Sequence, residues 1–536
     1  MGGDTHREGD GPPRRTLRPV PQRGRLVVLA GGRHRHSRVT PSGVRGQTGP
    51  MERTDRDRQR ADDLWLAERL RATDHLDCLR EEDFSRLDRD GHVYLDHTGA
   101  GLYPESLVRQ HLEMLAGGVF GNPHSDNPTS RPASEMVEEA REAVLRFVGA
   151  DPDTYECIFT PNATGAIRLV AEAFPFGADR PLVLSSDNHN SVNGIREHAH
   201  RAGAPVTYVP VLAPDLRLDQ DRLLSALAGP PGLLALPAQS NYSGVQHPLP
   251  EVPDGWRVLW DAAAFAPTNP LHLDDRHVDF VSLSFYKVFG YPTGVGALIA
   301  RRDALAELVR PWFAGGTIAI ASVAAAGHRL VPGHAGFEDG TLDFLSLPAV
   351  RAGIEVMERI DINSVHDRVQ VLTAWTLERM QDLRHANGSP LVQVLGPWEP
   401  VDRGATVAFV LVDPDGHELA DRSVERMATT AGISLRTGCF CNPGAGETAR
   451  DVSADDLRPF LAADTYEGRP VSLCEVDQVF RRHRDVGVSA LRVSLGMSSN
   501  EADVRTWIDF LGGLLDRRAD ELDPPPPVPP PRPDGA

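Results

Sequence analysis

The chain has 536 residues, of which 40% are hydrophobic, and carries a formal net charge of −19. Such a chain can bury a large core and form two domains, whereas its acidity disfavours nucleic acid, whose backbone is also anionic. Because no stretch approaches the roughly 20 apolar residues of a membrane span, we expect small-molecule chemistry without a nucleic-acid or membrane partner.

The first 60 residues are predicted to form a disordered basic arm. Within residues 1–50, ten arginines against three acids give a charge of +7, and glycine and proline are frequent. Arg14 and Arg15, followed by LVVLA, resemble an export signal, but five apolar residues are fewer than the roughly 7–15 of an h-region. Met51 opens the first stretch with helical periodicity and is therefore a candidate for the natural start.

Residues 61–350 are predicted to form a large α/β domain. Between residues 155 and 300 the apolar runs are CIFT, PLVLSS, VTYVPV, GLLALPA, RVLWDAA, DFVSLSF and GVGALIA. The helical patterns VNGIREHAHRAG and DRLLSALAG lie between some of them. Apolar strands separated by helices indicate a mostly parallel sheet that is covered on both faces.

Polar side chains fall at the carboxyl ends of these strands. They are His189 after VLSS, Asn241 after LLALPA, Asp261 at the end of RVLWD, and Lys287 after VSLSF. Ligands of such sheets bind beyond the carboxyl ends of the strands. We therefore expect the four side chains to converge on one edge of the sheet.

Lys287 is the only lysine of the chain, against 55 arginines. A buried lysine can lose its proton and attack a carbonyl, which an arginine cannot do near neutral pH. An amine, a carboxylate, an imidazole and an amide at one edge suit a carbonyl cofactor with a ring nitrogen, and pyridoxal phosphate fits that description. In this interpretation Lys287 forms a Schiff base with the cofactor, and Asp261 keeps the ring nitrogen protonated.

From about residue 351 the pattern changes to long amphipathic helices, RAGIEVMERI and HDRVQVLTAWTLERM, followed by the strand-like TVAFVLVD and ALRVSLG. We predict a smaller α+β domain over residues 351–520. Residues 521–536 form a proline-rich tail without core-forming residues. The five cysteines are too few and too scattered for a disulfide framework and indicate a reducing cytoplasm.

Nine motifs in order resemble one family over roughly residues 60–515. They are YLDHTGAG, GNPHS, FTPNATGAIRLV, DNHNSV, QSNYSGVQ, LWDAA, SFYKVFGYPTGVGALI, FEDGT and LRTGCFCNPGA. They are similar to motifs of the class V, fold type I pyridoxal-phosphate enzymes, and among these to the cysteine-desulfurase domain of molybdenum cofactor sulfurases. The resemblance implies the fold type I architecture, with a mostly parallel sheet in the large domain.

The resemblance also assigns residues to the cofactor. It implies that His189 stacks on the ring and that Asn241 hydrogen-bonds the phenolic oxygen. Ala163, Thr164 and Ser284 are expected at the phosphate. Thr341, in FEDGT, is expected at the phosphate of a neighbouring subunit, which implies a homodimer with shared active sites.

Three positions depart from the pattern of many relatives. Tyr286, which we count among the cofactor-binding residues, stands where histidine precedes the lysine, and Ala264 replaces a glutamine that assists the phenolic oxygen. Gly446 stands where the sulfurase branch has a second loop cysteine. Eukaryotic molybdenum cofactor sulfurases also continue into a further β-rich domain, so the sulfur acceptor is not identified.

On the substrate side, the resemblance places Arg436 and Arg492 at the amino-acid carboxylate, with His124 of GNPHS as a further contact. Cys441, five residues after Arg436, aligns with the nucleophile of the family. We expect it on a mobile loop, where a thiolate takes sulfur from the substrate and presents a persulfide to an acceptor. The implied reaction converts L-cysteine to L-alanine.

Other interpretations stay open at this point. Cys441 could be a structural thiol in another class V enzyme, such as a C–S lyase, an epimerase or an aminotransferase, or the chain could be a retired scaffold. Cys439 and Cys441 as zinc ligands would need two further partners at suitable spacing, so we predict no metal site. Asp261 could be a helix N-cap, His189 and Asn241 ordinary loop residues, and the two arginines surface ion pairs.

Overall fold

The computed structural model describes residues 64–522, except residues 275, 463, 467 and 485. These residues belong to one compact unit. The predicted basic arm and nearly all of the predicted proline-rich tail lie outside the described residues. In the part that is described, no helix combines the length and the apolar character needed to cross a membrane.

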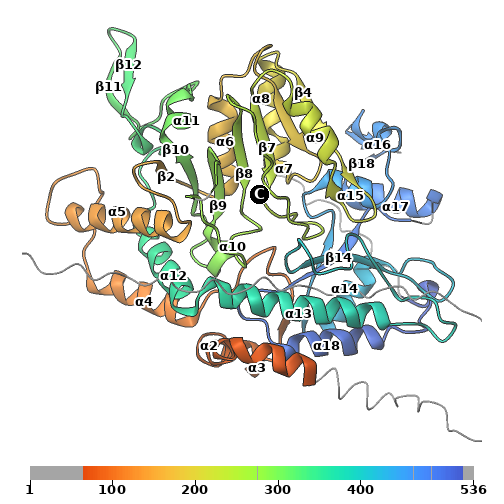
Figure 1. Cartoon of the computed structure of the whole chain (residues 1–536). Coiled ribbons are helices and arrows are strands. Elements are labelled where there is room, and N and C mark those ends of the chain that lie inside the picture. Colours follow the sequence, from red (N-terminus) through yellow and green to blue (C-terminus); the bar gives the residue numbers. More distant parts are fainter. Residues whose placement is uncertain (1–63, 275, 463, 467, 485, 523–536) are drawn as a thin grey trace, which may run out of the picture. The chain divides into compact units, whose positions relative to one another are not determined.

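A seven-stranded sheet forms the centre of the fold (Figure 1). Its strands lie in the order β2 (Tyr155–Thr160), β10 (Gly296–Arg301), β9 (Phe280–Ser284), β8 (Arg257–Asp261), β7 (Leu233–Pro237), β3 (Leu182–Ser185) and β4 (Val206–Val209). Strand β10 is antiparallel to both β2 and β9, and the pairs from β9 to β4 are parallel. Six strands therefore point the same way, which confirms the predicted, mostly parallel sheet.

Both faces of the inner part of this sheet are buried, and the strands there, β3, β7, β9 and β10, are largely apolar. In β7, Leu233 and Ala235 join a core with helix α6 (Ala163–Ala173) and helix α8 (Ile195–Arg201), whereas Leu234 and Leu236 join the core on the other face. A strand with only one buried face would alternate apolar and polar residues. The apolar runs of the sequence thus reflect burial on two sides.

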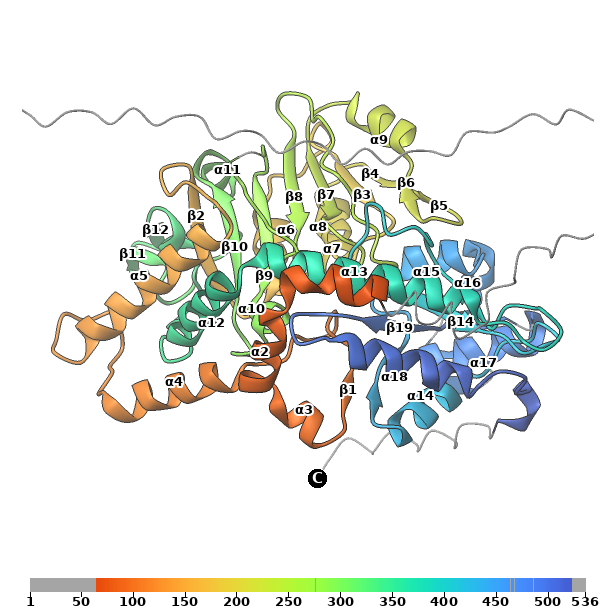
Figure 2. The same ribbon diagram turned by 60° about the horizontal axis from the view of Figure 1, so that its bottom comes forward.

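Helices α4 (Glu105–Gly117), α5 (Ser130–Phe147) and α12 (Leu347–Ile360) pack together beside the sheet, and α13 (Ile362–Asp382) follows α12 (Figure 2). The shorter helices of the sheet region are α7 (Asn190–Asn193), α9 (Gln220–Leu227), α10 (Phe285–Phe289) and α11 (Arg302–Glu307). A hairpin of β11 (Ile318–Ser322) and β12 (Gly327–Leu330) projects from this region (Figure 1). The predicted boundary at residues 350 and 351 falls inside α12, and the division into two domains stays a prediction.

A second, four-stranded sheet has the order β13 (Val392–Val394), β14 (Thr406–Leu411), β19 (Ala490–Ser494) and β16 (Arg436–Gly438). Its helices are α14 (Asp421–Thr430), α15 (Pro443–Ala449), α16 (Ala454–Leu461), α17 (Leu473–Arg484) and α18 (Glu501–Gly512). Strand β1 (Val93–Tyr94), from the beginning of the described chain, pairs in parallel with β15 (Ile433–Ser434). The segment that follows β1 is thereby brought against this second sheet.

The other predicted elements are present, with two breaks that local chemistry explains. The run VTYVPV forms β4 and contributes to the short strand β5 (Val211–Leu212). Pro210 separates the two strands, because it has no N–H to donate. Strand β5 turns away to pair with β6 (Arg217–Leu218). The predicted helix over VNGIREHAHRAG is divided at Gly194 into α7 and α8.

Candidate active site

The carboxyl edge of the large sheet gathers the predicted cofactor residues. Asp261 and Ser284 are the last residues of β8 and β9, which lie side by side and run in parallel. His189 follows β3 and begins helix α7, and Lys287 lies in α10, directly after β9. The predicted convergence is supported by the mutual electrostatic influence of His189, Asp261 and Lys287.

The amine of Lys287 makes no hydrogen bond to any residue that the structure describes. Burial lowers its pKa below the ordinary value, and the nearby Asp261 carboxylate opposes this shift. Arg492 and Arg436 add to the lowering because they are positive as well. A lysine in these surroundings is a better nucleophile than a solvated one, because a larger fraction of it is unprotonated.

Asp261 offers one free carboxylate oxygen. Its Oδ1 accepts hydrogen bonds from the Ser282 hydroxyl (2.8 Å) and from the Ala263 N–H (3.1 Å). Its Oδ2 accepts none from the described residues, although the side chain is 9% exposed. A turn follows β8, so Asp261 is not the cap of a helix. The free oxygen can accept a hydrogen bond from a protonated ring nitrogen.

His189 is held as a neutral imidazole. Its Nδ1 accepts the backbone N–H of Ser191 at 3.1 Å, which places the ring proton on Nε2. Burial lowers the pKa of His189, Asp261 partly opposes this, and the positive charges of Lys287 and Arg492 add to the lowering. The ring is therefore fixed in direction and uncharged, which suits stacking on a flat ligand.

The first turn of helix α6 provides a candidate phosphate site. The Ala163 N–H donates to the Ser284 hydroxyl at 2.8 Å, and Thr164 and Ser191 share a hydroxyl hydrogen bond of 2.7 Å. Asn162 caps the helix by accepting the Gly165 N–H at 3.0 Å. Hydroxyl groups at a helix N-terminus favour an anion, because the N–H groups and the helix dipole point toward it.

Arg436 and Arg492 lie directly opposite one another on β16 and β19. Both donate to one carboxylate, Asp96: Arg436 through Nε (2.9 Å) and Nη2 (2.6 Å), and Arg492 through Nη2 (3.0 Å). Arg492 also donates to the Asn241 carbonyl at 2.7 Å. The arginine side chains are 48% and 2% exposed, respectively, so only Arg436 resembles a surface residue.

Cys441 lies on a strained loop. Phe440 and Cys441 have φ angles of 54° and 57°, the left-handed region that costs non-glycine residues roughly 1–2 kcal/mol each. Asn241 Nδ2 donates to the Phe440 carbonyl at 2.7 Å, and the Asn190 N–H donates to the Cys441 carbonyl at 2.8 Å. Hydrogen bonds thus hold the loop that the sequence predicted to be mobile.

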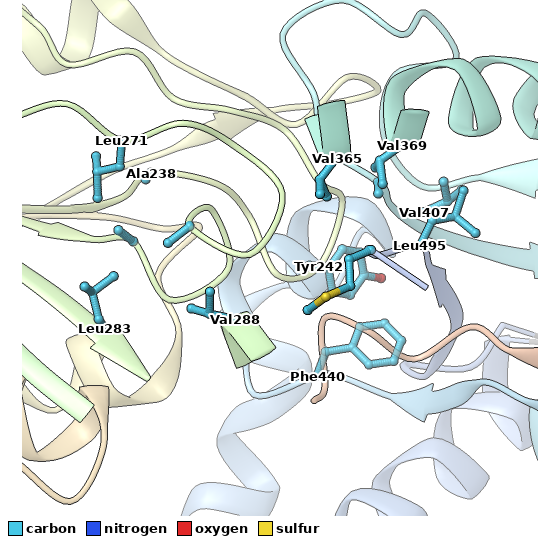
Figure 3. Close-up of a cluster of buried hydrophobic side chains, with 14 of the residues drawn as sticks. Ala238, Tyr242, Leu271, Leu283, Val288, Val365, Val369, Val407, Phe440 and Leu495 are labelled. Atoms are coloured by element: carbon cyan, nitrogen blue, oxygen red, sulfur yellow. The ribbon is translucent and has the colours of Figure 1, made fainter. Parts of the chain in front are cut away.

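The neighbouring Asn442 fixes the loop from its other end. It is fully buried and donates to the Asp187 carboxylate at 2.7 Å, and Asp187 also bonds the buried His247 at 2.7 Å. Phe440 packs beside Tyr242, with ring centroids 5.4 Å apart (Figure 3), and beneath the Arg492 guanidinium at 4.6 Å. The loop is therefore wedged between the two sheets.

The two loop cysteines have different surroundings. The exposed Cys441 acts electrostatically on Lys287, Arg436 and Arg492, whereas the half-buried Cys439 acts on Tyr242. Among the described residues, the group with metal-ligand spacing is Asp413, Asp415 and His417, and it includes neither cysteine. Cys441 is thus the cysteine that is close enough to the lysine and the arginines to influence their charges.

Three predicted site residues lie at the margin. Tyr286 is half-buried. Burial raises its pKa, which the charge of Arg436 lowers and the charge of Asp261 raises. Thr341 is exposed beside a cavity of about 270 Å³ that Gly165 also lines, and it accepts from Asn122 at 3.4 Å. His124 is exposed, and the structure gives it no side-chain contact with the other site residues.

The sequence did not assign roles to Asp96, Asp187 or Asn442. Asp96 stands in YLDHTGAG, Asp187 in DNHNSV and Asn442 directly after Cys441, so all three lie within quoted motifs. Their hydrogen bonds join segments that are 340 and 255 residues apart in the chain. The sequence shows an acidic or amide residue inside each motif, but it does not show which residue each one binds.

These residues fit pyridoxal phosphate. Lys287 provides an unpartnered amine, Asp261 a free carboxylate oxygen, His189 a neutral ring and helix α6 an anion-binding terminus. Asn241, which was predicted to contact the phenolic oxygen, donates to the cysteine loop in this structure. The fold and the site together define a pyridoxal-phosphate enzyme of fold type I.

The comparisons with known proteins agree with this class. Residues 93–506 match the aminotransferase class-V family, and the chain belongs to that family. Molybdenum cofactor sulfurases from Arabidopsis thaliana and Bos taurus are 35% and 34% identical to it. Each match covers 81% of this chain, but 57% and 51% of the relative, so the chain spans about half the length of the curated relatives it matches.

Solved structures confirm the predicted fold. A cysteine desulfurase from Thermococcus onnurineus covers 82% of this chain with a TM-score of 0.66 and 22% identity, and the chain covers 98% of that structure. The cysteine desulfurase CsdA from Escherichia coli, in an S-sulfonic acid form, covers 84% with a TM-score of 0.64 and 20% identity, with 99% of that structure covered. These structures confirm the predicted fold type, whereas the family match confirms the predicted family and cofactor class.

Proposed function

We propose that this chain is a pyridoxal-phosphate-dependent cysteine desulfurase that moves sulfur from L-cysteine to Cys441. One observation carries the proposal: the unpartnered amine of Lys287 feels the charges of Asp261, the two arginines and Cys441. The carboxylate-binding pair and the sulfur-accepting thiol are therefore close enough to the cofactor anchor to influence its charge. Relatives named as molybdenum cofactor sulfurases support the same activity.

Bound pyridoxal phosphate supplies an electron sink for the bonds at the substrate Cα. In our proposal Lys287 holds the cofactor and later moves the proton at Cα, which its lowered pKa favours near neutral pH. Asp261 keeps the ring nitrogen protonated through its free oxygen, and His189 covers the ring. Arg436 and Arg492 bind the substrate carboxylate, so that the Cα bonds have one orientation.

The sulfur atom itself passes from the thiol of the substrate to the thiol of the enzyme. The Cys441 thiolate attacks the sulfur of L-cysteine, forming an S–S bond while the Cβ–S bond breaks and leaves its electron pair on carbon. The carbon takes up a proton and becomes the methyl group of L-alanine, and Cys441 retains the sulfur as a persulfide. No external oxidant or reductant enters this step. An acceptor protein or cofactor then takes the sulfur.

The proposal includes a homodimer with shared sites. The hairpin β11–β12 projects from the sheet region (Figure 1). Its Ile320 and Val323 are exposed, and so are Trp312 and Phe313, which precede it in the chain. Such apolar side chains suit a second copy of the chain. In this proposal Thr341, which is exposed, contacts the phosphate of the neighbouring subunit. We further propose a cytoplasmic location, because all five cysteines are unpaired.

The test is incubation of the purified protein with L-cysteine, with and without reductant, followed by assays for alanine and sulfide. We expect stoichiometric alanine without reductant and repeated turnover with it. The peptide that contains Cys441 should gain about 32 Da, removable by reductant. Activity on another amino acid without this adduct would favour a C–S lyase, an epimerase or an aminotransferase, and a protein without cofactor or activity would favour a scaffold.

A further inference from the structure

The carboxylate of Asp96 accepts hydrogen bonds from both arginines of the pair. We propose that Asp96 is a positioning residue that holds Arg436 and Arg492 together and cancels one of their two charges, so that the pair receives a single carboxylate. The inference rests on the proposed function, because it deepens the role of the two arginines. It concerns the arrangement of their donors and not the chemistry at Lys287.

Without Asp96 the two arginines would repel each other. They are directly opposed on antiparallel strands, where like charges destabilise the pair. Arg492 is also 2% exposed, and a buried guanidinium needs a counter-charge that is always present. Asp96 provides it by giving Oδ1 to Arg492 and Oδ2 to Arg436. A net charge of +1 remains on this cluster.

Asp96 is fixed in place by its backbone. The Leu95 N–H donates to the Ser434 carbonyl at 2.9 Å, and the Ser494 N–H donates to the Leu95 carbonyl at 2.7 Å. The Thr98 N–H donates to the Ser494 hydroxyl at 2.9 Å. This segment therefore joins the neighbourhoods of both arginines and cannot swing away. Asp96 is a built part of the site and not an exchangeable substitute for the substrate carboxylate.

Gly99 provides independent evidence that the backbone closes tightly over this ion pair. A methyl group on Gly99 would lie 2.5 Å from Arg436 Nη2 and 2.5 Å from Asp96 Oδ2. A side chain at this position would therefore separate the two charged groups. Gly99 → Ala should disturb the same arrangement as a substitution of Asp96, while leaving the Asp96 carboxylate in the chain.

Two guanidinium donors of the pair have no partner among the described residues, and one of them belongs to Arg436, whose side chain is 48% exposed. Arg492 Nε is buried and has no hydrogen-bond partner in the described part of the chain, and Arg436 Nη1 makes no hydrogen bond there either. The same segment also reaches the lysine, because the Gly101 N–H donates to the Tyr286 carbonyl at 3.0 Å. Asp96 thus belongs to a segment that sets the arginine donors relative to Lys287.

The experiment compares two amines that differ in one group. L-alanine and L-alaninamide are titrated into the holoenzyme, and binding is followed by the absorption of the bound cofactor. We expect Asp96→Asn to weaken L-alanine by a factor of about 10 to 100, the range for a lost charge-assisted hydrogen bond, and L-alaninamide by less than about twofold. Gly99→Ala should shift the same ratio, and Asp96→Glu should restore part of it.

The matched control is Asp88→Asn, which removes a carboxylate from another buried arginine, Arg80 (2.8 Å). It should leave the ratio of the two affinities unchanged. Equal weakening of both amines by Asp96→Asn, or tighter binding of L-alanine, would overturn the inference; should that variant not fold, Gly99→Ala decides by the same ratio. A wild type that binds no cofactor, or responds to neither amine, would instead refute the proposed function.

Discussion

The two sheets treat their polar groups in opposite ways. At the edge of the seven-stranded sheet, the Lys287 amine and one oxygen of Asp261 have no hydrogen-bond partner among the described residues. Beside the four-stranded sheet, Arg436, Arg492 and the Cys441 loop are tied to Asp96, Asn241 and Asp187. The first region leaves its reactive groups without hydrogen bonds, whereas in the second region hydrogen bonds hold the side chains and the loop in position.

This difference follows from what each region must bind in the proposed function. An amine that is partly withdrawn from water without a partner is costly to charge, and its pKa is lowered for that reason. A ligand that satisfies it should therefore stabilise the protein. The arginines have their counter-charge already, so a ligand there gains from donors that are arranged in advance. Substitutions in the two regions should consequently affect different measurements.

Lys287→Ala should have the largest effect. No second lysine exists in the chain, so both the covalent link and the proton transfer are lost. We expect turnover to fall by at least about a thousandfold. Borohydride treatment followed by peptide mapping should place the cofactor on Lys287 in the wild type and nowhere in the variant. Appreciable turnover by the variant would contradict the role assigned to the sheet edge.

Cys441→Ser should affect the function of the cysteine loop and leave the sheet edge unchanged. The variant should keep its cofactor absorption, because the sheet edge is unchanged, but lose the persulfide and release of alanine from L-cysteine. Cys439→Ser is the matched control, since Cys439 influences the pKa of Tyr242 and not that of Lys287. It should retain most of both signals. An adduct on Cys439 would move the nucleophile by two residues.

Asp261→Asn should cause a smaller loss, on the order of a hundredfold in turnover, comparable to removal of one electrostatic group from an active site. A neutral amide cannot keep the ring nitrogen protonated, but it can still accept the Ser282 hydroxyl. Cofactor binding should therefore persist, and its absorption spectrum reports this. Ser282→Ala, which keeps the carboxylate, should retain most activity. Near-normal turnover of Asp261→Asn would remove Asp261 from the mechanism.

The sequence was more informative about the sheet edge than about the clamp beside it, which consists of Asp96, Arg436, Arg492 and the Cys441 loop. Strand ends can be read from apolar runs, and parallel strands bring their ends together, so Asp261 and Lys287 could be placed without coordinates. The partners of Arg436 and Cys441 could not, because Asp96 and Asp187 are hundreds of residues away in the chain. Only the pairing of β1 with β15 and the loop conformation bring them together.

The smallest predicted effect concerns the dependence of stability on pH, through a histidine beside the clamp. His97, next to Asp96, is buried, and burial lowers its pKa to about 4, which Asp96 opposes and Arg80 reinforces. Its ring packs edge-on against Tyr94 at 4.9 Å. In the unfolded chain a histidine has a pKa of about 6.5. Below that pH the unfolded state takes up a proton that the folded state refuses, so stability is lost as the pH falls.

This loss should run from about pH 6.5 down to about pH 4 and amount to about 3 kcal/mol at most. His97→Gln should lower stability at pH 7 through poorer packing, but its disadvantage should shrink toward pH 4, because glutamine does not titrate. Urea unfolding at several pH values measures this slope. Tyr94→Phe, which keeps the ring that His97 contacts, is the control and should follow the wild-type slope. A parallel pH profile for His97→Gln and the wild type would show that His97 does not contribute to acid sensitivity, and that the clamp is stabilised without a cost from this imidazole.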